Sequence, residues 1–155
     1  MIGNAEFMEQ LNKYYDIWQE YNYVYEEWAK AHGLSVNSLL VLCAVYDGGD
    51  ACTQKKISQR WMIPKQTINM VFKDLEHRGF VKLIPLPEDK RNKVIQFTNA
   101  GKEYADTIIS QLRKAELSAA EETGLERMKQ LNENMALFVQ FFKKAGGRQS
   151  NETNT

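Results

Sequence analysis

The first thirty residues carry a regular stripe of aromatic and large apolar side chains. Members of the stripe are spaced alternately four and three residues apart: Phe7, Leu11, Tyr14, Trp18, Tyr21, Tyr25 and Trp28. This spacing puts every member on one face of an α-helix, with acidic and amide residues on the other faces. The stripe therefore predicts a long amphipathic helix over residues 5–32, and Gly33 is expected to end it.

Capping and turn residues divide the middle of the chain into short elements. Ser35 and Thr53 are suited to be N-caps, and Pro64 suits the first turn of a helix because it lacks an N–H. Gly79 is expected to end that helix. Two β-type runs around a charged connection predict a hairpin. The expected elements are helices over 36–45, 54–61 and 64–78, a brief extended stretch at 51–52, and strands over 80–84 and 94–97.

The C-terminal third reads as two more helices. Thr98 is a plausible cap for a helix that runs to about Leu117. The segment Ser118-Ala-Ala-Glu121 has the spacing of a capping box, which predicts that another helix begins near Ala119. The polar residues 146–155 predict a disordered tail.

Charge is distributed unevenly along the 155 residues, although the net charge is zero. Residues 1–52 hold 2 basic and 8 acidic side chains, residues 53–93 hold 10 and 4, and residues 94–155 hold 8 of each. The net charge alone argues against a nucleic-acid-binding protein, but the basic middle segment indicates one positively charged face.

Length and cysteine content narrow the class of protein. A chain of this length suits one domain. The longest apolar run, 39–46, is too short to span a bilayer, and the N-terminus has no signal-peptide pattern. Two cysteines, Cys43 and Cys52, cannot make a disulfide framework, so a reducing compartment is expected. We therefore expect a cytoplasmic protein with no membrane partner.

The order of the elements is that of a winged helix-turn-helix with helical extensions, and short motifs add to it. The resembling stretch runs TQKKISQRWMIPKQTINMVFKDLEHRGFVKLIPLPEDKRNKVIQFTNAG. Its matching features are Lys65-Gln66-Thr67, Leu75-Glu76, Arg78-Gly79, the triplet Asp89-Lys90-Arg91, Phe97-Thr98 and Gly101. In their order and spacing they resemble the DNA-binding lobe of the MarR family of bacterial transcriptional regulators. Two departures are Met70, where the family often carries Arg, and Phe97 in place of Leu.

The resemblance implies a mainly α fold with a small β wing. It covers roughly residues 5–145 and implies a single domain of residues 1–145, with a winged-helix DNA-binding lobe at 35–98 and helical dimerisation regions at 5–32 and 99–145.

The helix over 64–78 is the predicted reader of the major groove. Gln66 and Asn69 can pair with adenine, and Thr67 can touch a thymine methyl. Helix N-termini also attract phosphates. The candidate contacts in the helix-turn-helix are Thr53, Gln54, Lys55, Lys56, Lys65, Gln66, Thr67, Asn69 and Lys73.

The wing, residues 85–93, is the predicted minor-groove contact. Arg91 at the hairpin tip suits the negative potential of a narrow minor groove. Asp89 is expected to hold the Arg91 guanidinium extended, as the resemblance also implies. Lys90 and Lys93 would add phosphate contacts.

A second apolar stripe with helical spacing lies near the C-terminus: Met128, Leu131, Met135, Phe138 and Phe142. The two terminal stripes predict a homodimer, because they exceed what a small winged helix can cover. Two recognition helices would then reach successive major grooves of a pseudo-palindromic double-stranded operator. The rival interpretation packs both stripes within one chain. The resemblance also implies a small aromatic or anionic effector in a cleft beside the lobe, with candidate residues Tyr14, Trp18, Tyr25 and Tyr104.

Other functions stay open at this point. One alternative is a dimeric interaction module of the same fold with weak or lost DNA binding, and another is a thiol-based redox-sensing regulator using Cys52. Cys43 is expected to be an inert core residue. The sequence shows no catalytic motif, no cofactor motif and no metal-ligand cluster near His32 or His77, so we expect neither an enzyme nor a cofactor.

Overall fold

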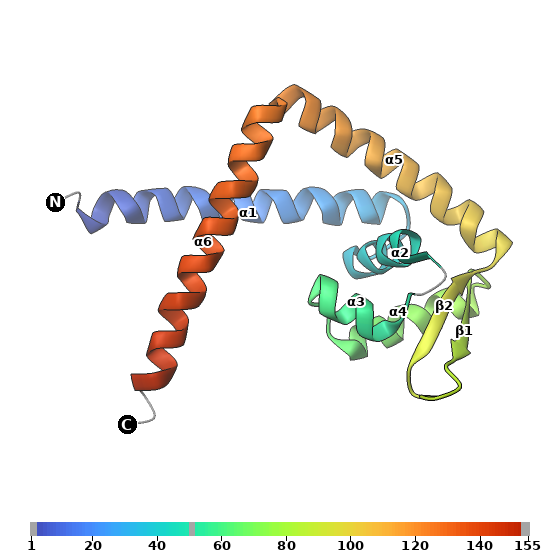
Figure 1. Cartoon of the computed structure of the whole chain (residues 1–155). Coiled ribbons are helices and arrows are strands. Elements are labelled where there is room, and N and C mark those ends of the chain that lie inside the picture. Colours follow the sequence, from blue (N-terminus) through green and yellow to red (C-terminus); the bar gives the residue numbers. More distant parts are fainter. Residues whose placement is uncertain (1–2, 50–51, 153–155) are drawn as a thin grey trace. The chain divides into compact units, whose positions relative to one another are not determined.

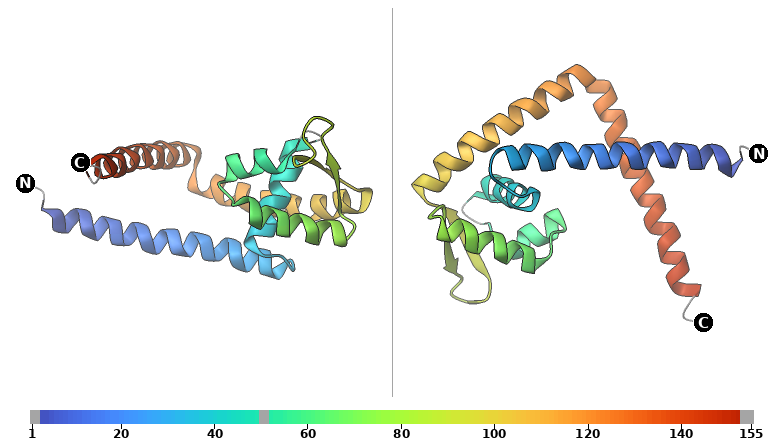
Figure 2. Two further views of the ribbon diagram at one scale, coloured as in Figure 1. Left: turned by 90° about the horizontal axis from the view of Figure 1, so that it is seen from below. Right: turned by 180° about the vertical axis from the view of Figure 1, so that it is seen from behind.

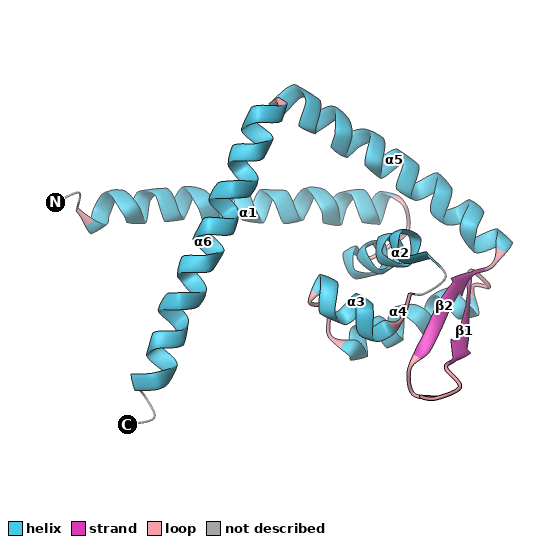
Figure 3. Ribbon diagram, in the orientation of Figure 1, coloured by secondary structure: helices cyan, strands magenta, loops and turns pink. Residues whose placement is uncertain are grey.

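The computed structural model describes residues 3–49 and 52–152, except for the side chains of 147–152. Ala51 of the expected extended stretch lies outside the described residues. Helices and one small antiparallel sheet follow one another in the expected order, so the mainly α fold with a β wing is confirmed (Figures 1 and 3). The elements are α1 (Asn4–Ala31), α2 (Val36–Gly48), α3 (Gln54–Trp61), α4 (Lys65–His77), β1 (Val81–Pro85), β2 (Lys93–Phe97), α5 (Asn99–Thr123) and α6 (Leu125–Glu152).

The chain divides into two compact units, residues 1–109 and 110–155, and each is described by itself. Unit 1 holds α1 to α4, the hairpin and the beginning of α5, and unit 2 holds the rest of α5 and α6. The expectation of a single domain over residues 1–145 stays a prediction.

The core of unit 1 is the winged-helix lobe, formed by α2, α3, α4 and the hairpin. Its largest fully buried side chains include Leu39, Leu42, Ile57, Ile68, Leu75 and Ile95. Burial of each aliphatic side chain of this size stabilises a fold by roughly 1.5–3 kcal/mol. Because these residues come from different elements, their packing fixes α3 and α4 relative to the hairpin.

Local caps set the boundaries of the lobe helices. The Ser35 hydroxyl accepts the Ser38 N–H at 3.1 Å, and the Thr53 hydroxyl accepts the Lys56 N–H at 3.3 Å, so both predicted N-caps are confirmed. Met62 ends α3 in the left-handed conformation, with φ of 53°. Pro64 is the N-cap of α4 rather than a first-turn residue, because its extended ψ of 138° is not helical.

The wing is a two-stranded antiparallel hairpin joined to the lobe at its base. Val81 pairs with Phe97 and Leu83 with Ile95. The Ile95 N–H also donates to the Cys52 carbonyl at 2.9 Å, which attaches β2 to the segment before α3. The hairpin tip closes where the Leu86 N–H donates to the Asn92 carbonyl at 3.1 Å.

A tight junction connects the end of α4 with the beginning of α5. Thr98 Oγ1 donates to the Gly79 carbonyl at 2.6 Å and accepts the Gly101 N–H at 3.0 Å. A Cβ on Gly101 would lie 1.8 Å from the Phe80 carbonyl oxygen, so only glycine fits. This packing explains why Thr98 and Gly101 occur at their spacing from Gly79.

The prediction that a helix begins near Ala119 is wrong. α5 continues through the Ser118–Glu121 segment to Thr123, and the break falls at Gly124, whose φ is 90°. Alanine and glutamate favour the helical conformation, so the chain stays helical through this segment. A capping box stabilises the beginning of a helix, and no helix begins here. The backbone of α6 continues to Glu152 and so covers most of the expected disordered tail, while residues 153–155 lie outside the described residues.

Helix α1 is one unbroken helix in both views of Figure 2 and has little apolar cover within unit 1. Ala29 is its one buried residue, whereas Phe7, Trp18 and Tyr21 are more than half exposed. No single helix within the described ranges combines the length and low polarity needed to cross a bilayer. α1 and α2 meet that test only when joined across their 82° bend.

Candidate nucleic-acid interface

A basic concavity of about 430 Å³ lies between α4 and the wing. Phe72 and Leu83 supply its apolar lining, and none of the described acidic side chains lines it. Its polar lining consists of residues that the sequence had predicted to contact DNA: Gln54, Asn69, Lys73, Lys90, Arg91 and Lys93. Tertiary packing thus brings together four cations and two amides from α3, α4 and the hairpin.

Gln54 connects α3 to the first turns of α4. Its Nε2 donates to the Lys65 carbonyl at 2.9 Å and to Asn69 Oδ1 at 2.7 Å. The second bond occupies the Asn69 oxygen and leaves the Asn69 Nδ2 as a donor, which suits an acceptor on a base edge. Gln54 therefore orients Asn69 in addition to lying in the concavity.

The solvent-facing side of α4 is polar except for one residue. Ile68, Val71, Phe72 and Leu75 point into the core. Lys65, Gln66, Asn69 and Lys73 are exposed, Thr67 is half-buried, and Met70 is 71% exposed between Gln66 and Lys73. This face can therefore present amide, ammonium and apolar groups to a groove.

The wing tip corrects one predicted role. Asp89 was expected to hold the Arg91 guanidinium, but its Oδ1 accepts the Arg91 backbone N–H at 3.2 Å. The Asp89 carbonyl also accepts the Asn92 N–H at 3.0 Å. This is an Asx-type turn, in which a short side chain binds the backbone two residues on. Asp89 shapes the tip and leaves the Arg91 side chain exposed.

Two of the predicted DNA-contact residues, Thr53 and Lys56, do not lie on the face of α3 that packs against α4. Thr53 is buried, and its hydroxyl caps α3. Lys56 lies about 200° around the helix from Gln54, because each residue advances an α-helix by about 100°. It lines a different cavity, against α2. Lys55 is exposed and does not line that cavity.

The four predicted effector residues are not gathered at one place. Tyr14, Trp18 and Tyr25 lie on α1, where Tyr25 packs against Tyr21 with ring centroids 5.0 Å apart. Tyr104 stacks on Phe80 at 4.3 Å. The effector role of these residues stays a prediction.

Arg78 takes part in a cluster that the sequence reasoning missed. Its guanidinium lies 4.8 Å from the Phe80 ring centroid and 5.1 Å from that of Tyr104, and it donates to the Tyr104 hydroxyl at 3.3 Å. The Arg78-Gly79 pair and Gly101 were the sequence features that could have indicated this cluster. Cation–π contacts of this kind stabilise the α4–α5 junction by about 0.5–1 kcal/mol each at exposed sites.

The cysteines have the surroundings of unreactive thiols. Cys43 and Cys52 are both buried thiols. Burial raises the pKa of the Cys52 thiol, and the nearby Lys56 ammonium offsets part of that rise. A raised pKa disfavours the thiolate that redox sensing requires. Within the residues that the structure describes, no group of three or more His, Cys, Asp and Glu side chains is placed to hold a metal ion.

Comparison with known proteins gives one consistent result. The MarR family model matches residues 32–92. HTH-type transcriptional repressor NicR of Pseudomonas putida is 25% identical over 114 residues, covering 70% of this chain and 72% of NicR.

Two solved structures share the fold. The MarR family regulator NMB1585 of Neisseria meningitidis has a TM-score of 0.79 at 24% identity, covering 90% of this chain and 98% of that one. Staphylococcus aureus MarR in complex with salicylate and kanamycin has a TM-score of 0.69 at 21% identity, covering 90% and 94%.

Proposed function

Because the chain belongs to the MarR family of transcriptional regulators, we propose that it is a dimeric, sequence-specific DNA-binding repressor that responds to a small ligand. The family is one of regulators and not of enzymes. Helix α4 reads the major groove of double-stranded DNA, and the wing enters the adjacent minor groove. The protein acts in the cytoplasm, without a cofactor or catalytic activity of its own.

The basic concavity between α4 and the wing is the observation that carries the proposal. Lys73, Lys90, Arg91 and Lys93 lie around it without an acidic neighbour in the lining. Cations gathered in this way neutralise phosphates and release counterions, which drives association with DNA. Gln66, Thr67 and Asn69 on α4 then distinguish base edges.

Dimerisation is supported by the apolar side chains that each unit by itself leaves exposed. Trp18, Tyr21 and Val24 are each more than half exposed on α1. Phe141 and Phe142 on α6 are also more than half exposed. Large exposed patches of this kind mark protein–protein interfaces. A second copy of the chain gives a two-fold dimer whose operator is a pseudo-palindrome.

A ligand response is supported by a relative of the same fold. Staphylococcus aureus MarR has been solved with salicylate and kanamycin. A ligand changes repression only if it binds the DNA-competent and DNA-incompetent states with different affinity.

Selection of bound sequences from random duplex DNA tests the function. We expect an enriched pseudo-palindrome with half-sites about one helical turn apart. Affinity for that duplex should fall steeply with salt, with a log–log slope of about −0.9 per neutralised phosphate. No enrichment, together with a flat salt response, would instead favour the interaction module that lacks DNA binding.

Lys90→Gln and Lys30→Gln form a matched pair for this measurement. Lys90 lines the concavity, whereas Lys30 is an exposed lysine near the end of α1. The first variant should lower the salt slope by about 1, and the second should leave it unchanged.

A further inference from the structure

Helix α4 leaves one large apolar side chain exposed, that of Met70, on a face that is otherwise polar. Met70 is 71% exposed, whereas Ile68, Val71, Phe72 and Leu75 are buried in the lobe. Since each residue advances an α-helix by about 100°, the four buried residues occupy an arc of about 100°, and Met70 lies about 150° from the centre of that arc. Its side chain therefore projects away from the core, on the side of α4 that is open to a partner.

The neighbours of Met70 on this face suit a nucleic acid. Gln66 lies about 40° and Lys73 about 60° around the helix from Met70, and both are exposed. The acidic residues of α4 come after Lys73, so the helix carries no negative charge from its first residue to that lysine. This stretch can enter a groove without repelling phosphates, and Met70 lies within it.

The major groove of DNA offers an apolar side chain one kind of apolar partner. Every base pair presents hydrogen-bonding groups there, but only thymine adds a methyl group, at C5. Methionine has no donor and only a weak acceptor, so against another base it would leave polar groups of the base edge without partners. Its unbranched, flexible side chain can adjust to a small apolar group. We propose that Met70 is a specificity-determining residue that selects thymine in the operator by packing against the C5 methyl group.

This assignment rests on the proposed function, since it requires α4 in the major groove, and it names the base and the group on that base that one side chain recognises. It also separates Met70 from Asn69. Asn69 lines the concavity beside the wing, and its Oδ1 accepts a hydrogen bond from Gln54 Nε2 at 2.7 Å. Because Asn69 lies about 100° around the helix from Met70, the two side chains are expected to reach different bases.

Uracil in place of thymine tests the contact, because this exchange removes the methyl group and leaves base pairing and all hydrogen-bonding groups unchanged. The operator that the wild type selects from random duplex DNA is remade with uracil at one thymine position of each half-site at a time. At one position we expect the Kd to rise about fourfold per half-site, the equivalent of about 0.8 kcal/mol for one buried apolar carbon. Equal affinity for thymine and uracil duplexes at every position would overturn the assignment.

Variants of Met70 connect that methyl group to the side chain. Met70→Ala should bind the thymine and uracil duplexes equally at this position, whereas Met70→Leu, which keeps a large apolar side chain, should retain the difference. Met62→Ala truncates another exposed methionine, in the turn before α4, and should also retain it. The exposed position of Met70 means that its variants should keep the wild-type melting temperature. A methyl effect that persists undiminished in Met70→Ala belongs to another residue, such as Thr67, and contradicts the proposal.

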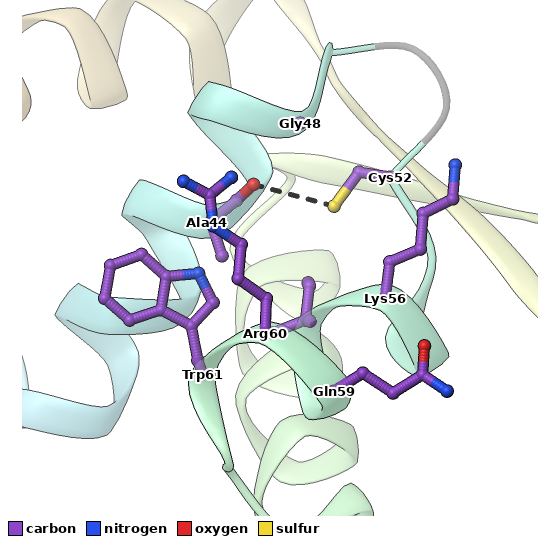
Figure 4. A pocket seen from close by; sticks show the side chains of 8 residues that line it. Ala44, Gly48, Cys52, Lys56, Gln59, Arg60 and Trp61 are labelled. Atoms are coloured by element: carbon purple, nitrogen blue, oxygen red, sulfur yellow. Dashed lines mark hydrogen bonds between the residues drawn. The ribbon is translucent and has the colours of Figure 1, made fainter. Parts of the chain in front are cut away.

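Met70→Arg should change the base that is selected. Arginine pairs bidentately with guanine O6 and N7, so random-duplex selection with this variant should return guanine where the wild type returns the methyl-sensitive thymine. Gln59→Arg adds the same charge on α3, in the lining of the cavity against α2 (Figure 4), and should leave the selected sequence unchanged. Thymine retained at that position by Met70→Arg, or guanine gained there by Gln59→Arg, would remove Met70 from base recognition.

The same binding assay separates this proposal from the one on which it rests. A chain that binds no duplex at low salt contradicts the proposed function and the thymine contact together. A chain that binds its selected operator tightly, but equally well with and without each thymine methyl group, contradicts the role of Met70 alone.

Discussion

Helices α1 and α2 follow one another in the chain, and both are rich in apolar residues, yet they differ sharply in burial. Six residues of α2 are buried in the winged-helix lobe, whereas Ala29 is the one buried residue of α1. The core of the lobe is filled by side chains of the lobe itself. The apolar side chains of α1 are not covered within unit 1, and a second copy is the cover that we propose. The two helices should therefore respond differently to substitution.

Leu42→Ala should have the largest effect, because Leu42 is fully buried in the lobe. Truncating a buried leucine leaves a cavity and lowers the free energy of unfolding by about 2–5 kcal/mol. Urea denaturation at two protein concentrations should give the same loss at both. A loss that grows on dilution would mean that the lobe core depends on assembly.

Trp18→Ala should act through assembly instead. Trp18 is 53% exposed in the single chain, so its removal leaves no internal cavity. Truncating an aromatic anchor at an interface weakens association by roughly 2–4 kcal/mol. Sedimentation equilibrium should show a raised dimer dissociation constant. Asp16→Ala, on the polar side of the same helix, is the control, and equal behaviour of the two variants would remove the stripe from the interface.

Arg91→Ala should affect neither folding nor assembly. Its side chain is exposed at the wing tip, and Asp89 holds only its backbone N–H. Operator binding should weaken by about 1–3 kcal/mol, as measured by fluorescence anisotropy. Lys82→Ala, on β1 but outside the basic concavity, should bind nearly normally. Comparable losses in both variants would indicate a general charge effect.

Met62→Gly should produce the smallest change, and it should be stabilising. Met62 is the one non-glycine residue with positive φ among those described, and its side chain is 84% exposed. The left-handed conformation costs an L-residue about 1–2 kcal/mol, of which the greater chain entropy of glycine cancels roughly half. Thermal denaturation should show a melting temperature a few degrees higher. A lower value would mean that the Met62 side chain makes a stabilising contact in the dimer.

Local sequence signals predicted most of the lobe, and the errors share one cause. Ser35 and Thr53 cap their helices as expected, because a cap is a contact between residues three apart. The Ser118–Glu121 segment has the same kind of spacing, but it continues a helix. Spacing shows that a capping bond can form, whereas the positive φ of Gly124 decides where the chain turns.

The candidate site residues were predicted from their residue types, whereas the packing of the helices decides where each of their side chains lies. Lys55 and Lys56 are adjacent and chemically identical, yet Lys56 lines the cavity against α2 and Lys55 does not. Gln54 was expected to meet DNA; it lines the basic concavity and also orients Asn69 from the neighbouring helix. Neither outcome can be read from the chain, because each depends on which element packs against each face of α3.

The sequence by itself determined the order of the elements, the basic middle segment and the apolar stripe of α1, since periodicity, capping and charge are properties of neighbouring residues. Only the tertiary structure decided that Lys73, Lys90 and Arg91 gather around one concavity and that Asp89 binds backbone rather than guanidinium. A cavity is bounded by residues from different elements, so its lining exists only once burial of the core has fixed those elements against one another.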